Sequence, residues 1–190
     1  MSAPRSDTRQ RIQEVARELF AEKGVQRTSL QDIAARLGIT KPALYHHFSS
    51  REDLVRSIVA PLIDGGEQFV AECERADGLT PTELLGRYFD YFYLHRAALV
   101  TVVSELSTIA DLGLIDSMLA WRERLGRVIF GPDLTLEQDV RAVIALGGLQ
   151  DCCLQFPDTP ADALRAAGVA GALDALGLSQ KPPRSADSQC

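Results

Sequence analysis

The segment Thr28–Phe48, TSLQDIAARLGITKPALYHHF, decides the fold of this chain. It predicts a short helix, a tight turn and a second short helix. Thr28 with Gln31 and Ser29 with Asp32 both have the spacing of a capping box, in which each side chain bonds the backbone N–H of the other residue. Gly38 stands where the first helix must end, because glycine enters the left-handed conformation without steric cost. The pattern therefore indicates two helices joined at a glycine.

The second helix is expected over Thr40–His47, because Thr40 is a good N-cap and proline is tolerated in a first turn. Its outward residues are Lys41, Ala43, Tyr45, His46 and His47. A helix of this size fits the major groove of DNA, and its N-terminal residues reach base edges. Phenol and imidazole groups bond phosphate oxygens. The face predicts DNA binding, and the alternative is a helical hairpin with an ordinary polar face.

Residues 9–58 resemble the N-terminal domain of TetR-type bacterial transcriptional regulators. The matching pieces are RIQEVARELFAEKG, TSLQDIAARLGIT and KPALYHHFSSREDLV, in that order. The resemblance implies an all-α fold of about nine helices. Residues 1–50 would form a three-helix, helix-turn-helix DNA-binding domain, with the start of the fourth helix reaching about residue 56. Residues 51–178 would form an effector-binding and dimerisation domain, and the polar segment 179–190 is expected to be a disordered tail.

The charge distribution agrees with a DNA-binding head. The chain has a net charge of −6, but residues 1–56 carry ten Lys and Arg against seven Asp and Glu. The rest carries ten against nineteen. A basic head on an acidic body leaves one face suited to a duplex.

The residues expected at the DNA come from the segment above and from its flanks. Thr28, Tyr45, His47 and Arg51 are expected to position the phosphate backbone, and by resemblance Arg51 occupies the basic position at the start of the fourth helix. Lys41 is the candidate for a base contact, and Ala43 for a thymine methyl. The full predicted set is Arg27, Thr28, Ser29, Thr40, Lys41, Pro42, Ala43, Tyr45, His46, His47 and Arg51.

The resemblance also implies a small, largely apolar effector bound among the fourth to eighth helices. The candidate lining is Leu62, Phe69, Phe89, Phe92, Val103, Met118, Trp121, Leu149 and Cys152, and the alternative for each is ordinary core packing. Glu105 and Asp151 are acidic groups that could orient a polar part of such a ligand.

The last two helices carry small residues at intervals, and interior glycine needs a reason because each costs about 1 kcal/mol. In the family these helices pair with their copies in a homodimer. The predicted interface is Val143, Gly147, Leu164, Gly168, Gly171 and Ala175, and the alternative is close packing within one subunit.

Other classes of function find no support in the sequence. It contains no G-x-S-x-G, P-loop, H-E-x-x-H or dinucleotide motif, so we expect no enzyme, cofactor or metal site. No apolar run reaches the roughly 18 residues of a membrane span, and no signal region begins the chain, so a cytoplasmic protein is expected.

The sequence thus predicts a homodimeric repressor that an unidentified small effector releases from a palindromic operator in double-stranded DNA. The alternative is a helix-turn-helix regulator controlled by a partner protein or by cysteine oxidation.

Overall fold

The computed structural model describes the backbone of residues 5–104 and 114–179, and the side chains of 7–101 and 115–179. Within these ranges it contains nine α-helices, one short 3₁₀ helix (η1) and no strand, which confirms the predicted all-α fold. The elements are α1 Arg5–Lys23, η1 Val25–Arg27, α2 Leu30–Leu37, α3 Lys41–Tyr45, α4 Arg51–Arg75, α5 Pro81–Leu94, α6 Arg96–Ser104, α8 Leu114–Phe130, α9 Leu136–Gln155 and α10 Ala161–Leu176. The predicted tail from residue 180 onward and the side chains of Val103 and Glu105 lie outside the described part.

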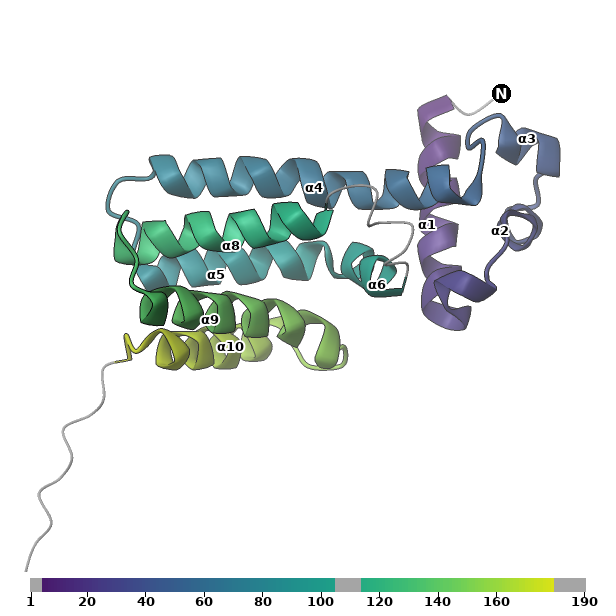
Figure 1. The fold of residues 1–190 in the computed structure, drawn as a ribbon. Coiled ribbons are helices and arrows are strands. Elements are labelled where there is room, and N and C mark those ends of the chain that lie inside the picture. Colours follow the sequence, from purple (N-terminus) through teal and green to yellow (C-terminus); the bar gives the residue numbers. More distant parts are fainter. Residues whose placement is uncertain (1–4, 105–113, 180–190) are drawn as a thin grey trace, which may run out of the picture.

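Helix α4 joins the two ends of the molecule (Figure 1). Its first turns meet a head formed by α1, η1, α2 and α3, and its remaining length lies against the body formed by α5, α6, α8, α9 and α10. Helix α6 also contacts α1 and η1, so body and head touch beside α4 as well as through it.

The head is organised around a small apolar core. Helix α1 buries one stripe, with Ile12 and Ala16 fully inaccessible, against residues of α2 and of the α3 segment. Leu44 and Phe48 come from the far end of that segment and are also fully buried. Burying side chains of this size stabilises the fold by about 1.5–3 kcal/mol each. This packing fixes the angle at which α3 is presented.

Helix α4 is unbroken through Pro61 and Gly65–Gly66, although proline and glycine in a helix interior favour a bend. Pro61 has no N–H for the carbonyl of Ser57, four residues earlier. Gln13 of α1 replaces that donor: its Nε2 lies 3.2 Å from the Ser57 carbonyl oxygen and 2.9 Å from the Ser57 hydroxyl. The helix therefore tolerates its proline through a hydrogen bond from the head.

Two of the body helices begin at capping boxes. Thr80 with Glu83 and Thr135 with Gln138 form complete capping boxes at the starts of α5 and α9. Buried aromatic rings of α5 fill the middle of the body. Those of Tyr88 and Phe92 lie with their centroids 4.6 Å apart. The body interior is thus occupied by side chains of its own.

Candidate nucleic-acid interface

The α3 segment is held by its two ends. Gly38 ends α2 with φ 68°, and the hydroxyl of Thr40 accepts the backbone N–H of Ala43 at 3.4 Å. The helix is shorter than the predicted span Thr40–His47, because the amides of His47 and Phe48 both donate to the carbonyl of Leu44 and close a turn. His46 and His47 therefore follow α3 rather than extend it.

The outward face of α3 is made of the predicted residues. Lys41, Pro42, Ala43, Tyr45 and His46 are exposed, and His47 is half-buried. The ammonium of Lys41 lies 5.7 Å from the centre of the Tyr45 ring, one turn along the helix. Arg9 of α1 supports the segment from behind, because its Nη1 donates to the carbonyl of His47 at 2.6 Å and its guanidinium lies on the Phe48 ring.

A hollow of about 420 Å³ lies between α3 and the starts of α2 and α4. Its lining is Ser29, Leu30, Gln31, Lys41, Tyr45, Ser49, Ser50, Arg51 and Glu52. Ser29 and Ser50 are the N-caps of α2 and α4, so two helix N-termini open at this hollow. Free N–H groups and the helix dipole attract anions there, and a lysine ammonium and a phenol stand beside them. The arrangement suits a phosphate group of a nucleic-acid backbone.

Four of the predicted residues, Ser29, Lys41, Tyr45 and Arg51, meet at this hollow. Arg51 is half-buried, and its Nη2 donates to the carbonyl of Val25 at 2.9 Å, which ties η1 to α4. Arg27 is exposed, and its Nε donates to the carbonyl of Lys23 at 2.6 Å.

Thr28 does not have the predicted role of contacting the phosphate backbone with its side chain. Its side chain is only 2% exposed, and its hydroxyl lies 2.9 Å from the carbonyl oxygen of Gly24 and 3.3 Å from that of Leu19. The hydroxyl closes the end of α1 and is not available to a phosphate. The pattern TSLQD offers two adjacent hydroxyls with cap spacing, and only Ser29 caps α2.

Gln31, Ser50 and Glu52 also line the hollow, although they are not among the residues predicted at the interface. Hydrogen bonds from its own backbone N–H and from the Ser50 hydroxyl lower the pKa of the Glu52 carboxyl. The hollow therefore has one fixed negative charge at its rim. The signal was the pairing of two capped helix starts on either side of α3.

The predicted effector residues are not gathered at one cavity. Leu62, Phe92 and Trp121 are buried in the core, and Phe69 packs between rings of α5, 5.3 Å from Tyr91. Phe89 borders a hollow between α5 and α10, whereas Met118 borders one between α6, α8 and α9. Continuous apolar faces allow several such groupings, and only packing selects one.

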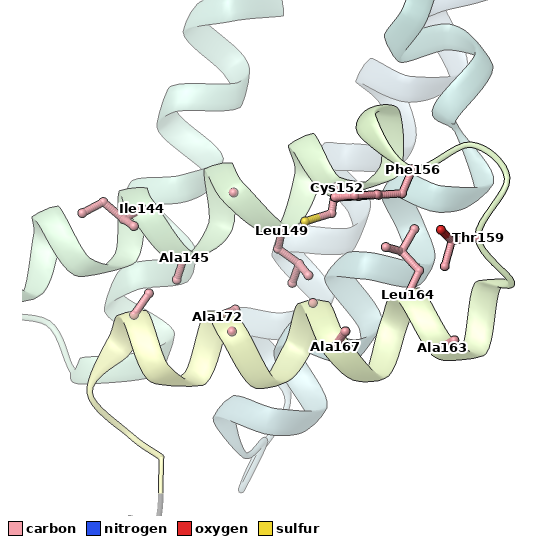
Figure 2. Close-up of a pocket in the computed structure, with 14 residues that line it drawn as sticks. Ile144, Ala145, Leu149, Cys152, Phe156, Thr159, Ala163, Leu164, Ala167 and Ala172 are labelled. Atoms are coloured by element: carbon pink, nitrogen blue, oxygen red, sulfur yellow. The ribbon is translucent and has the colours of Figure 1, made fainter.

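Leu149 and Cys152 were also predicted at the effector site, but they line a groove between α9 and α10 rather than the body interior. This groove, of about 540 Å³, is shown in Figure 2. Its walls are apolar or small, from Ile144 and Phe156 on α9 and its end to Ala163 and Ala167 on α10. Ile144 is 59% exposed and Phe156 50%, so large apolar side chains face solvent in a single chain.

Four of the six predicted interface residues, Leu164, Gly168, Gly171 and Ala175, line this groove. Val143 is exposed on α9 beside it. Gly147 was predicted at the dimer interface, but the guanidinium of Arg122 of α8 lies against it. Nη1 is 3.4 Å from the position that a Cβ would take. The missing side chain of Gly147 serves a contact within the subunit.

Cys73 and Cys153 are buried, and burial raises the pKa of each thiol to about 11. Because the thiolate is the reactive form, neither is suited to sensing oxidants. In the described ranges no three His, Cys, Asp or Glu side chains are grouped so as to hold a metal ion. Among the described helices, none combines the length and apolar character needed to cross a membrane.

Residues 12–58 match the family model described as bacterial regulatory proteins, tetR family. The chain is similar to a probable HTH-type transcriptional regulator, ArpR, of Pseudomonas putida, with 36% identity over 75 residues, which is 40% of this chain and 36% of that protein. It is also similar to the HTH-type transcriptional repressor KstR2 of Rhodococcus jostii, with 40% identity over 60 residues, which is 32% of this chain and 29% of that protein. The chain thus spans about a third of the length of these curated relatives.

Solved structures extend the similarity over most of the chain. The TetR family transcriptional regulator PfmR from Thermus thermophilus has 27% identity and a TM-score of 0.63, covering 83% of this chain and 94% of that one. The ketosteroid transcriptional regulator KstR2 of Mycobacterium tuberculosis has a TM-score of 0.73, covering 90% and 93%, and at 22% identity it shows the shared fold.

Proposed function

Because this chain belongs to the TetR family of bacterial regulatory proteins, we propose that it is a sequence-specific DNA-binding repressor. The observation that carries the proposal is the exposed face of α3 beside two capped helix starts. Leu44 and Phe48 are buried behind that face, so its polar groups are held out rigidly. The regulators and repressors to which the head is similar support the same reading.

Some of the predicted residues would contact bases, and others would contact the phosphate backbone. Lys41 begins α3 and would donate to a guanine, while the Ala43 methyl would meet a thymine methyl. Ser29, Tyr45 and Arg51 surround the hollow and would hold a phosphate. Arg27, Thr40, Pro42, His46 and His47 border these two groups in the chain and would fix the angle of approach.

A binding selection from random duplexes at fixed salt tests this division. Lys41→Ala should change the recovered sequence, because a good base contact contributes about 1–3 kcal/mol of discrimination. Tyr45→Phe should weaken selected and random duplexes alike, by about tenfold, since it removes a hydrogen bond to a charged group. Arg75→Ala removes a charge at the far end of α4 and serves as the control. An unchanged sequence preference in Lys41→Ala would refute the base-reading role.

The protein would act as a homodimer, with a second copy of the groove between α9 and α10 covering the first. Apolar, solvent-facing walls and glycines that allow close approach suit a helix pair packed on its copy. A two-fold dimer predicts a palindromic operator with half-sites about one helical turn or more apart.

An effector would release the protein by binding best to the arrangement of heads that does not fit DNA. A hydrogen bond and ion pairs connect α8 to α4 and would transmit such a change. Trp121 of α8 donates its ring N–H to Glu67 of α4 at 3.1 Å, and Arg124 of α8 pairs with both Glu67 and Glu74.

A further inference from the structure

A hollow of about 200 Å³ opens between α6, α8 and α9. It is lined by Leu99, Ile115, Met118, Leu119, Arg122, Gln150, Asp151 and Leu154. Five of these side chains are apolar, and Arg122 is the cation among them. Its volume is close to that of about seven water molecules, which admits a small organic molecule.

The guanidinium of Arg122 is fixed but is not neutralised. Its Nη2 lies 3.1 Å from Oε1 of Gln150, which also accepts the hydroxyl of Tyr88 at 3.3 Å. Gln150 and Tyr88 are buried, and burial raises the pKa of Tyr88, so the phenol remains a neutral donor. The guanidinium also lies against Gly147, where a Cβ would come within 3.4 Å of Nη1.

No carboxylate of the described residues pairs with Arg122, and its buried Nε has no hydrogen-bond partner there. Arg124, two residues along α8, shows the contrast, because it binds two glutamates at 2.7 Å and 2.6 Å. A cation held in a half-buried site without a counter-ion is costly. Nε is too deeply buried to meet a ligand and Nη2 donates to Gln150, so Nη1 is the nitrogen left to donate to an anion.

We propose that this hollow binds the effector, and that the effector is a small monocarboxylate with an apolar body. The carboxylate would accept a charge-assisted hydrogen bond from Nη1 of the Arg122 guanidinium. The apolar part would lie on Leu99, Met118 and Leu154. The inference rests on the proposed function only in calling the ligand an effector; the binding site stands on its own geometry.

Asp151 limits the number of negative charges that the ligand can carry. Asp151 is exposed and lines the same hollow, so its carboxylate adds a negative charge to the lining. One negative charge is favoured by Arg122, and a second would be repelled by Asp151. The site therefore selects monoanions over dianions.

Calorimetric titration of the full chain with benzoate, hexanoate, benzamide and phthalate tests the site without DNA. Benzoate and hexanoate should bind, and Arg122→Met should weaken both by about tenfold to a hundredfold, the range expected for a lost charged hydrogen bond. Benzamide should bind weakly and equally to both proteins. Arg122→Met removes a buried unpaired charge and keeps the apolar stem, so it should fold.

Asp151→Asn is the second variant, at an exposed position. It should improve phthalate binding by a larger factor than benzoate binding, because a dianion is repelled more strongly by the Asp151 carboxylate. Benzoate binding that survives in Arg122→Met, or binding of benzamide alone, overturns the proposal, as does the absence of binding by both acids. If the acids bind through Arg122 but do not release a selected DNA palindrome, the binding site stands and the effector role in the proposed function fails.

Discussion

Gly66 of α4 lies directly against the indole of Trp121, and this contact shows why a glycine stands in the middle of a long helix. A Cβ at position 66 would come within 2.2 Å of the indole ring, whereas helix propensity alone favours alanine there by about 1 kcal/mol. The ring cannot retreat freely, because its N–H is bonded to Glu67. Close packing of α8 on α4 therefore decides the residue.

Gly66→Ala should lower the free energy of unfolding by about 1–3 kcal/mol, the usual cost of overpacking a core. Denaturant unfolding measures it. The double variant Gly66→Ala with Trp121→Leu should lose less than the sum of the two single losses, because the smaller side chain makes room for the methyl. Additive losses would show that the indole contact is not the cause.

Single residues also mark the limits of prediction from sequence. A capping box at the start of α2 and Gly38 in the left-handed region were predictable, because both depend on local backbone geometry. Thr28 was not, since the choice between two neighbouring hydroxyls depends on the end of α1. Arg122 was not singled out at all, because the absence of a counter-ion is a property of the folded body.

At the scale of elements, α4 and α1 are joined at the proline of α4. The carbonyl of Ser57, which Pro61 leaves without its usual helical donor, receives a hydrogen bond from Gln13. The same helix α1 holds the carbonyl of His47 through Arg9. Helix α1 therefore connects the proline of α4 to the segment that carries the DNA-facing residues.

Gln13→Ala should cost about 1 kcal/mol of unfolding free energy, since it leaves a carbonyl without a partner. In a Pro61→Ala background the cost should fall, because the new N–H at position 61 can bond Ser57. Thermal or denaturant unfolding of the four proteins gives the coupling. Gln10→Ala, exposed on α1, is the matched control and should change stability by less than about 0.5 kcal/mol. Equal costs in both backgrounds would rule out the compensation.

Helix starts were more predictable than helix ends. The starts of α5 and α9 carry complete capping boxes that depend on local sequence, whereas α3 ends at Tyr45, two residues before the predicted His47. The grouping of side chains inside the body was not predictable, because Phe89, Met118 and Leu149 belong to three different hollows although each lies on an apolar helix face. Periodicity identifies a buried face but not the neighbour that covers it.

At the scale of the whole molecule, the charge distribution favours DNA at the head, and the position of the apolar groove favours a second copy at the body. The head carries the basic excess and the body the acidic one, so a duplex is attracted to one end and repelled from the other. Helices α9 and α10 lie on the side of the body opposite α4 (Figure 1), so a second copy packed on the groove between them (Figure 2) would not obstruct α3.

Gly171 allows the homodimer to be tested without disturbing the fold. It lines the groove, and a Cβ built there meets no atom within 4 Å, so a single chain accepts a side chain at this position. Gly171→Arg should raise the dimer dissociation constant by about two orders of magnitude or more, because a charge buried in an apolar interface without a partner costs several kcal/mol. Sedimentation equilibrium measures the change.

Ala166→Arg adds the same side chain at an exposed position of α10 outside the groove, and it should remain a dimer. The monomeric Gly171→Arg protein should also bind a palindrome much more weakly than the wild type, since two heads are no longer held at one spacing, while its affinity for a single half-site stays the same. If Gly171→Arg dimerises as the wild type does, α9 and α10 are not the interface. If it is monomeric yet binds the palindrome with undiminished affinity, the operator is read by one head, and two-fold symmetry plays no part in recognition.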